Sequence, residues 1–206
     1  MIKENNWLKS NIQDFWGEIA PCDHLLQIYD NDLVFLSSLE GFTGSGFLAG
    51  DSVIIIATTA HINALNERLI HQGFDLNKLI NEKKYIPLDA EKTLSKFMIN
   101  NWPDEVLFVD FVRGLMKTAK QNNRKVRAFG EMVALLWAKG NNGATVRLEY
   151  LWNEFCAKEG FCLFCAYPKT GFTQSATDSL QHICSAHSKI ISGETGASTE
   201  IIYKCS

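Results

Sequence analysis

The chain has 206 residues, of which 46% are hydrophobic and 21% are charged. This length and composition suit one globular domain that can fill a sizeable core. The formal net charge of −3 at pH 7 argues against a dedicated nucleic-acid surface, because such surfaces normally carry a basic patch.

The N-terminal stretch lacks the features of a signal peptide. Charged residues interrupt its first twenty positions at Lys3, Glu4, Lys9, Asp14 and Glu18, so no apolar region of the required length is present. No apolar run elsewhere reaches the roughly 20 residues that span a bilayer. We therefore expect a cytoplasmic protein without membrane contact, whose six cysteines are buried thiols rather than disulfides.

The first predicted element is an amphipathic helix within residues 1–20. Apolar residues from Trp7 to Ile19 recur at spacings of three and four, which predicts a helix that docks on another surface. Pro21 ends this helix. We expect an N-terminal extension over 1–20, one domain over 21–190, and a poorly specified tail over 191–206.

Five apolar or β-branched runs then alternate with helix-period segments. The predicted strands are His24–Tyr29, Ser52–Ala57, Lys84–Asp89, Val126–Gly130 and Phe161–Tyr167. The longer predicted helices are Leu33–Leu48, Ala90–Ile99, Asp104–Gln121 and Ala144–Lys158. Because the connections are too long for hairpins, we expect an α/β fold of three layers around a mostly parallel sheet of about five strands.

Local signals refine three of these elements. Asp32 is placed to cap the helix Leu33–Leu48. Pro87 favours an edge position for the third strand, because proline lacks the N–H that a central strand needs. The helix Ala144–Lys158 places Val146, Tyr150, Leu151 and Phe155 on one face, which we expect to be buried.

A glycine-rich segment, Gly41-Phe42-Thr43-Gly44-Ser45-Gly46, has the glycine spacing of a phosphate-binding loop. It lacks the Lys-Ser/Thr pair of that loop, and it ends a predicted helix instead of opening one. The position where such a loop belongs, after the first strand, carries Asp30-Asn31-Asp32, whose carboxylates repel a triphosphate. We expect no ATP hydrolysis by the usual apparatus, and we expect the glycines to allow close packing of the helix or a helix irregularity.

The sequence offers weak signals for a metal site. Cys162 and Cys165 are three residues apart on a predicted strand and therefore point to opposite faces. Cys184 and His187 can share a helix face, but no second pair with ligand spacing accompanies them. Packed thiols beside a hydrogen-bonded imidazole are the plainer interpretation, so we expect no metal and no cofactor.

Glu131 is the strongest candidate for a ligand-binding residue. It follows the fourth strand and Gly130, at the carboxyl edge of the sheet, where open α/β sheets bind their ligands. Two interpretations stay open: a ligand anchor, or a structural carboxylate that pairs with Arg127 or Arg147. Tyr167 and Asp89 end other strands and are expected at the same crevice, and Trp137 is expected to be core or pocket wall. No signature of a known catalytic site is present, so we expect a protein that is not an enzyme.

Several segments together resemble the methanogen/methylotroph DcmR sensory domain, a relative of the KaiC and RecA ATPases. They occur in the family's order and cover about Asp23 to Ile190. The segments are His24–Tyr29, Gly50-Asp51 before Val53–Ala57, Ala128–Val133, Leu148–Asn153, Cys165–Pro168 and Cys184–Ser188.

This resemblance implies a RecA/KaiC-like three-layer domain with a degenerate P-loop, used as a sensory module. It implies recognition of a small hydrocarbon-like or related signal, with regulation of transcription or signalling. Family members often carry an attached DNA-binding or kinase domain, which this sequence does not show, so we expect it to act through a protein partner and without direct nucleic-acid contact. The ligand-binding residues carried over by position are His24, Tyr29, Glu131, Tyr167 and His187, and Trp137 joins them as pocket wall. The alternatives are a cryptic nucleotide-binding protein and a pure interaction module that acts as a homodimer.

Overall fold

The computed structural model describes residues 16, 19–20, 23–171, 183–185, 187–193 and 200–203. Most of the predicted N-terminal helix within 1–20 lies outside these residues. Of that extension, Trp16 is fully buried and packs its ring on Phe42 and Phe164, with ring centroids 5.7 and 5.4 Å apart.

A seven-stranded sheet forms the middle layer, in the order β3-β2-β6-β7-β1-β8-β9. All neighbouring strands are parallel except β9, which runs antiparallel to β8. The strands are β1 (His24–Tyr29), β2 (Ser52–Ala57), β3 (Tyr85–Asp89), β6 (Val126–Gly130), β7 (Cys162–Pro168), β8 (Lys189–Gly193) and β9 (Glu200–Tyr203). The five predicted strands are confirmed. Two further strands were not predicted: β8 spans the boundary between the predicted domain and its tail, and β9 lies in the tail.

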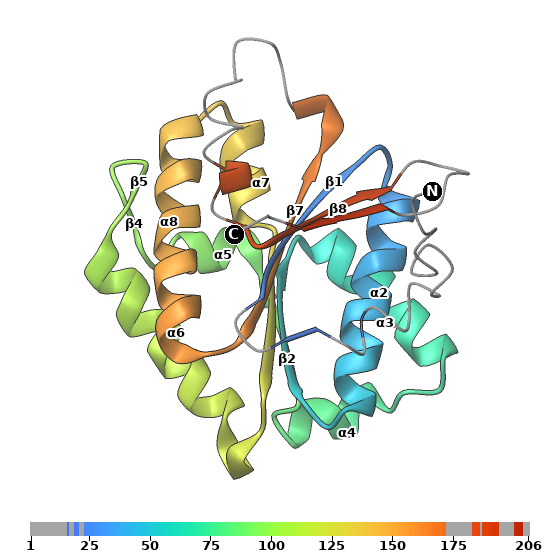
Figure 1. The fold of residues 1–206 in the computed structure, drawn as a ribbon. Coiled ribbons are helices and arrows are strands. Elements are labelled where there is room, and N and C mark those ends of the chain that lie inside the picture. Colours follow the sequence, from blue (N-terminus) through green and yellow to red (C-terminus); the bar gives the residue numbers. More distant parts are fainter. Residues whose placement is uncertain are drawn as a thin grey trace, which may run out of the picture.

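Helices cover both faces of this sheet (Figure 1). One face carries α2 (Asp32–Leu48), α3 (Thr59–His71) and α4 (Leu76–Asn81). The other carries α5 (Ala90–Leu94), α6 (Glu105–Ala119), α7 (Met132–Ala138) and α8 (Asn142–Glu159). The expected three-layer α/β architecture is therefore confirmed.

The sheet separates two apolar cores. In β2, Val53 and Ile55 face the α2/α3 side, whereas Ile54 and Ile56 face the α6/α8 side, and all four are 0% exposed. Alternating side chains along a strand produce this division. Burial of each such side chain contributes about 1.5–3 kcal/mol. Pro87 lies in β3 at the sheet edge, as expected.

Several helix boundaries differ from the prediction. Asn31, and not Asp32, caps α2, because its side chain accepts the Val34 N–H at 3.1 Å. The predicted helix Ala90–Ile99 stops at Leu94, and its end instead forms a small hairpin of β4 (Met98–Ile99) and β5 (Trp102–Pro103). Short 3₁₀ turns span Gln121–Asn123 and Lys169–Gly171.

The glycines of α2 allow close packing, as expected. A Cβ at Gly41 would lie 2.6 Å from Cδ1 of Trp16, and a Cβ at Gly46 would lie 2.7 Å from Cγ2 of Val53. Both distances are shorter than van der Waals contact, so only glycine lets α2 approach these side chains.

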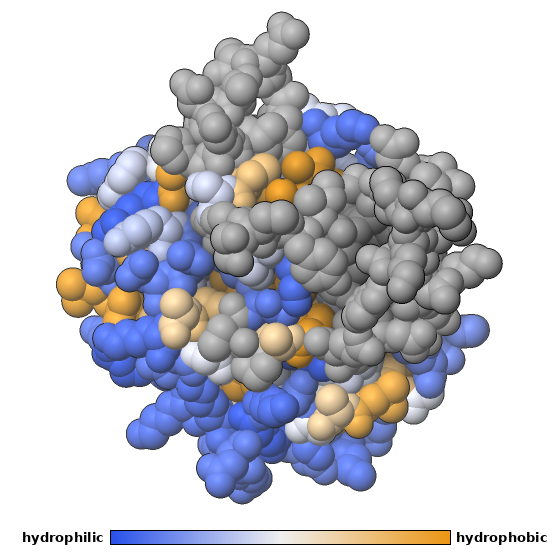
Figure 2. Space-filling model, in the orientation of Figure 1, coloured by the Kyte–Doolittle hydropathy of each residue, from blue (hydrophilic) through white to orange (hydrophobic). Residues whose placement is uncertain are grey.

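The described residues seen in Figure 2 are largely hydrophilic, with small hydrophobic groups between them. One such group lies at the left margin, where the β4–β5 hairpin and α6 are located. No helix among the described residues is long and apolar enough to cross a membrane.

Candidate functional site

Glu131 lies at the carboxyl end of β6 and connects it to the start of α3. Its backbone N–H donates to the Ile56 carbonyl at 2.8 Å. Its carboxylate accepts the Thr58 N–H at 2.8 Å on Oε2 and contacts Nδ1 of His61 at 2.8 Å on Oε1. Both carboxylate oxygens therefore have partners in neighbouring elements.

The predicted structural partners of Glu131 are wrong. Arg127 pairs with Asp51 at 2.8 Å, and Arg147 pairs with Glu105 at 2.7 Å. His61 takes their place because α3 begins directly beside the end of β6, whereas Arg127 lies at the amino-terminal end of that strand.

Tyr29 and His61 accompany Glu131 at this edge of the sheet. The Tyr29 ring stacks on Phe35 with centroids 4.9 Å apart, and Phe35 also contacts the His61 ring. Burial raises the pKa of Tyr29, and the negative charges of Glu131 and Asp32 add to this effect. The hydrogen bond to Glu131 raises the pKa of His61, although burial opposes it.

Asp89 also lies at the carboxyl edge, where it has structural partners. Its side chain caps α5 by accepting the Lys92 N–H at 2.9 Å, and it accepts the Thr59 hydroxyl at 2.7 Å. The loop after β1 is engaged in a similar way, since Asp30 pairs with Lys169 at 3.2 Å and Asn31 caps α2.

Tyr167 does not share a crevice with Glu131, contrary to expectation. Its side chain points to the α7/α8 side of the sheet, where Trp137 meets its ring edge to face at 6.3 Å. Glu131 contacts His61, on the α2/α3 side. Side-chain alternation along β7 explains the separation, because it decides which face each residue of the strand occupies.

Tyr167 instead belongs to a buried polar cluster of His24, Glu149, Cys165, Tyr167 and His187, which we call the histidine–glutamate cluster. All five residues are at most 3% exposed. They come from the start of β1, the middle of α8, β7 and the segment before β8. The Tyr167 hydroxyl donates to Oε1 of Glu149 at 2.5 Å.

The other oxygen of Glu149 is the centre of this cluster. Oε2 lies 3.5 Å from Nε2 of His24, 3.6 Å from Nε2 of His187 and 3.7 Å from Sγ of Cys165. Sγ of Cys165 also lies 3.6 Å from Nε2 of His24. One donor atom from each of His24, Glu149, Cys165 and His187 lies within 4.8 Å of the others, so these four are the described residues that suit a metal ion.

Burial controls the protonation of the cluster. It raises the pKa of Glu149 to about 7, although the hydrogen bonds from Tyr167 and Cys165 act in the opposite direction. The pKa values of Cys165 and Tyr167 are raised by burial and, in addition, by the negative charge of Glu149. Strongly shifted groups packed together are characteristic of functional sites.

The sequence prediction found His24, Tyr167 and His187, but it missed Glu149 and Cys165 as site residues. Tyr150 was expected on the buried face of α8, yet it is 53% exposed. Leu151 and Phe155 are buried as expected, and the buried face also includes Leu148, Glu149 and Trp152. The sequence signal for this buried face of α8 is the carboxylate of Glu149, which stands among apolar residues at helical spacing.

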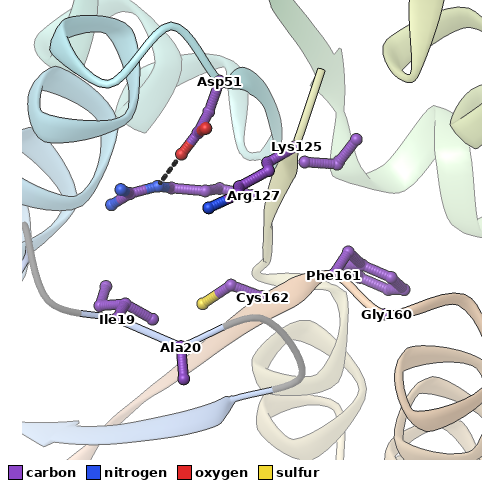
Figure 3. Close-up of a pocket in the computed structure, with 9 residues that line it drawn as sticks. Ile19, Ala20, Asp51, Lys125, Arg127, Gly160, Phe161 and Cys162 are labelled. Atoms are coloured by element: carbon purple, nitrogen blue, oxygen red, sulfur yellow. Dashed lines mark hydrogen bonds and ion pairs between the residues drawn. The ribbon is translucent and has the colours of Figure 1, made fainter. Parts of the chain in front are cut away.

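A small pocket of about 40 Å³ lies at the opposite, amino-terminal end of the strands (Figure 3). Arg127 reaches across its edge to Asp51, and it also donates to the Trp16 carbonyl at 2.8 Å and to Ser45 at 3.0 Å. Pockets for small ligands usually measure about 300 Å³ or more. We therefore interpret this region as a structural clamp that holds Trp16 against α2 and the sheet.

Comparisons with known proteins agree with this architecture. A KaiC-like protein from the hyperthermophilic archaeon Pyrococcus horikoshii OT3 is similar in fold, with a TM-score of 0.59 at 12% identity over 88% of this chain and 77% of that one. A second protein from Pyrococcus horikoshii OT3 gives a TM-score of 0.58 at 11% identity over 93% and 91% of the two chains. At these identities the likeness concerns the fold alone.

Sequence comparison gives the family. No curated protein matches the chain. The family model described as MEDS, the methanogen/methylotroph DcmR sensory domain, matches residues 23–188. This match spans every member of the histidine–glutamate cluster and most of the chain, and so the protein belongs to the MEDS family of sensory domains.

Proposed function

We propose that this chain is a non-catalytic sensory domain that binds a small hydrocarbon-like ligand at the histidine–glutamate cluster and signals to a regulatory protein partner. The observation that carries the proposal is the convergence of five polar side chains inside an apolar layer. Burial of polar groups costs free energy unless they are well paired. The cluster is therefore expected to serve binding more than stability.

The surroundings of the cluster favour a small ligand with an apolar part. Trp137 packs against Tyr167, and Trp152 and Leu148 of α8 belong to the same apolar layer. Glu149 and the two histidines supply hydrogen-bonding groups in this setting. A ligand with one polar group and a short apolar portion matches this combination.

The segment that carries His187 provides a route for the signal. Ser188 joins the start of β1, since its N–H donates to the His24 carbonyl at 2.8 Å and its hydroxyl accepts the His24 N–H at 3.0 Å. A ligand that shifts His187 would therefore shift the neighbouring start of β8. We propose that the partner detects this displacement.

The loop after β1 supports a role other than nucleotide binding. In this loop Asp30 pairs with Lys169, and Asn31 caps α2. Two further carboxylates, Asp32 and Glu131, lie at the same edge and disfavour a triphosphate. Titration with Mg-ATP is expected to give neither heat nor a thermal shift, and clear binding would favour the nucleotide-binding alternative.

The test is a thermal-shift screen of the full chain against short alcohols and halogenated hydrocarbons, with Glu149→Gln and Glu131→Gln compared with the wild type. We expect a ligand that raises the Tm of the wild type and of Glu131→Gln, but not that of Glu149→Gln. A ligand whose effect survives Glu149→Gln and disappears in Glu131→Gln would place the site at the carboxyl edge and overturn the proposal.

A further inference from the structure

Four donor atoms in the histidine–glutamate cluster have the spacing of a tetrahedral metal site. In a tetrahedral zinc site, bonds of about 2.0–2.3 Å separate the ligand atoms from each other by about 3.3–3.8 Å. Four separations between donor atoms of His24, Glu149, Cys165 and His187 are 3.5, 3.6, 3.6 and 3.7 Å. All four fall within the range expected for the edges of one tetrahedron.

Hydrogen bonding alone does not account for the two separations between an imidazole nitrogen and the Glu149 carboxylate. Ordinary N–H···O bonds measure about 2.7–3.2 Å. The two imidazole nitrogens approach Oε2 of Glu149 only to 3.5 and 3.6 Å. Both are held near the carboxylate at a distance that is too long for a good hydrogen bond, and that distance leaves room for an ion between them.

The outer nitrogens of both histidines are oriented for metal binding. Nδ1 of His187 donates to the Ile183 carbonyl at 2.6 Å, and Nδ1 of His24 faces Oδ1 of Asn153 at 3.4 Å. Since a backbone carbonyl only accepts hydrogen bonds, the neutral His187 ring carries its proton on Nδ1, and the lone pair of its Nε2 points into the cluster. A proton on Nδ1 of His24, facing Asn153, gives the His24 ring the same arrangement. Metal-binding histidines usually have such a partner on the second nitrogen.

Glu149 has a comparable outer partner. The Tyr167 hydroxyl donates to Oε1, which leaves Oε2 directed at the histidines and Cys165. Hydrogen bonds to the non-ligating oxygen orient a metal-bound carboxylate. Three of the four donor groups are thus positioned by second contacts.

From this geometry we infer that His24, Glu149, Cys165 and His187 bind one divalent metal ion of the zinc type, through Nε2, Oε2, Sγ and Nε2. Binding displaces the thiol proton of Cys165 to solvent, and the carboxyl proton of Glu149 also leaves where it is present. One thiolate and one carboxylate then balance the two positive charges of the ion. The neutral sum suits a site that is at most 3% exposed.

This inference rests on the proposed function, because it assigns the metal to the same cluster. Sulfur and imidazole ligands favour zinc over magnesium or calcium, which prefer oxygen. In the resulting sensory domain the ion holds His187 next to β1. A small ligand that exchanges with one protein donor would then move the segment before β8.

The test measures metal binding by the full chain directly. The purified protein, stripped with a chelator, is titrated with Zn²⁺ in competition with a chromophoric chelator, and Co²⁺ is used as a spectroscopic probe. We expect one ion per chain and a Co²⁺ spectrum that combines tetrahedral visible bands with a sulfur-to-cobalt charge-transfer band. Binding of less than half an ion per chain, or octahedral Co²⁺ without a sulfur band, would overturn the inference.

Matched variants identify the ligands. Cys165→Ser is expected to abolish the sulfur band, whereas Cys162→Ser, on the same strand but in the α2/α3 core, is expected to keep it. Asn153→Ala and Tyr167→Phe change only outer contacts and are expected to weaken binding about 10-fold to 100-fold. Circular dichroism of each metal-free variant checks its folding. A sulfur band that survives Cys165→Ser and disappears in Cys162→Ser contradicts the assignment.

Failure of this inference can be distinguished from failure of the proposed function. A protein that binds no metal but shows a ligand-induced shift dependent on Glu149 disproves the metal site and leaves the sensory site standing. One tightly bound ion, with no response to any compound in the ligand screen, supports the metal site and contradicts the small-ligand proposal.

Discussion

The imidazole rings of His24 and His187 lie against each other, with their centroids 3.9 Å apart and their planes inclined by 38°. One ring belongs to the first strand of the domain, and the other belongs to the segment that leads into β8. Two hydrogen bonds keep these two parts together: the Ser188 N–H donates to the His24 carbonyl, and the His24 N–H donates to the Ser188 hydroxyl. Because Glu149 lies beside both rings, one carboxylate of α8 contacts both β1 and the segment that leads into β8.

We expect the ionisation of Glu149 to destabilise the metal-free protein. Burial raises the pKa of this carboxyl to about 7, whereas the unfolded chain has the ordinary value of about 4.3. The folded state therefore holds the proton more tightly, so the stabilisation is complete below about pH 4.3 and is lost as the pH rises to about 7. The wild type should lose roughly 3 kcal/mol over this window relative to Glu149→Gln.

Urea unfolding at several pH values, with a chelator present, measures this difference. The wild type minus the Glu149→Gln variant is the informative quantity, because titrating groups that do not contact Glu149 contribute equally to both. A difference that does not change with pH would show that Glu149 is not protonated in the folded protein.

Glu131→Ala is expected to lower the free energy of unfolding by about 1–3 kcal/mol, because the Thr58 N–H loses its acceptor.

The hydrogen bond to Glu131 also raises the pKa of His61. This contribution is complete below the ordinary histidine pKa of about 6.5 and is lost as the pH rises through the higher folded value. Histidine titrates within the range of roughly pH 5 to 9. Thermal unfolding over this range should show the loss of stability in the wild type but not in Glu131→Ala. Asp32→Asn is the control, since Asp32 is 71% exposed and 4.0 Å from His61. A loss of stability in Asp32→Asn as large as that in Glu131→Ala would contradict this account.

The buried ion pair of Asp51 and Arg127 should strongly affect the free energy of unfolding when it is broken. Its side chains are only 10% and 6% exposed, so Arg127→Met leaves a buried carboxylate without its partner and should cost about 3–5 kcal/mol. Denaturant unfolding measures this loss. Asp110→Asn, in a pair whose side chains are 60% and 68% exposed, should change the stability by less than about 1 kcal/mol. Equal effects of the two substitutions would mean that burial does not set the strength of the Arg127 pair.

Gly41→Ala should destabilise the protein by about 1–3 kcal/mol, because the new methyl group overlaps the Trp16 ring. Gly114→Ala in α6 provides the matched control. A Cβ at Gly114 meets nothing within 4 Å, so helix propensity alone should stabilise this variant by up to about 1 kcal/mol. Thermal unfolding and Trp fluorescence measure both changes. A neutral Gly41→Ala would show that Trp16 does not depend on its contact with α2.

Local sequence patterns were sufficient for much of the fold. The strands His24–Tyr29 and Ser52–Ala57 were predicted with the bounds that the structure has. In the structure, Thr58, Asp75 and Asp104 cap α3, α4 and α6, and each of these caps depends only on neighbours within three residues. The order of strands and helices follows from these local signals, and with it the α/β class.

Contacts between distant segments were beyond these patterns. The strands β8 and β9 are short, and β8 is held in the sheet by pairing with β1 on one side and β9 on the other. Tyr167 was expected beside Glu131, since both lie near the carboxyl ends of strands, but the sheet separates their side chains. The choice of Asn31 over Asp32 as the cap of α2 likewise depends on the backbone conformation at the end of β1.

The sequence by itself thus determined the alternation of strands and helices, the family to which the segments point, and three of the five residues of the histidine–glutamate cluster. Only the tertiary structure decided that His24, His187 and Tyr167 meet at Glu149 and Cys165. The physical reason is that the pairing of β1 with β7 and β8, and the rotation of α8 about its axis, set which side chains face each other. Neither this strand pairing nor the rotation of α8 is encoded within a single stretch of the chain.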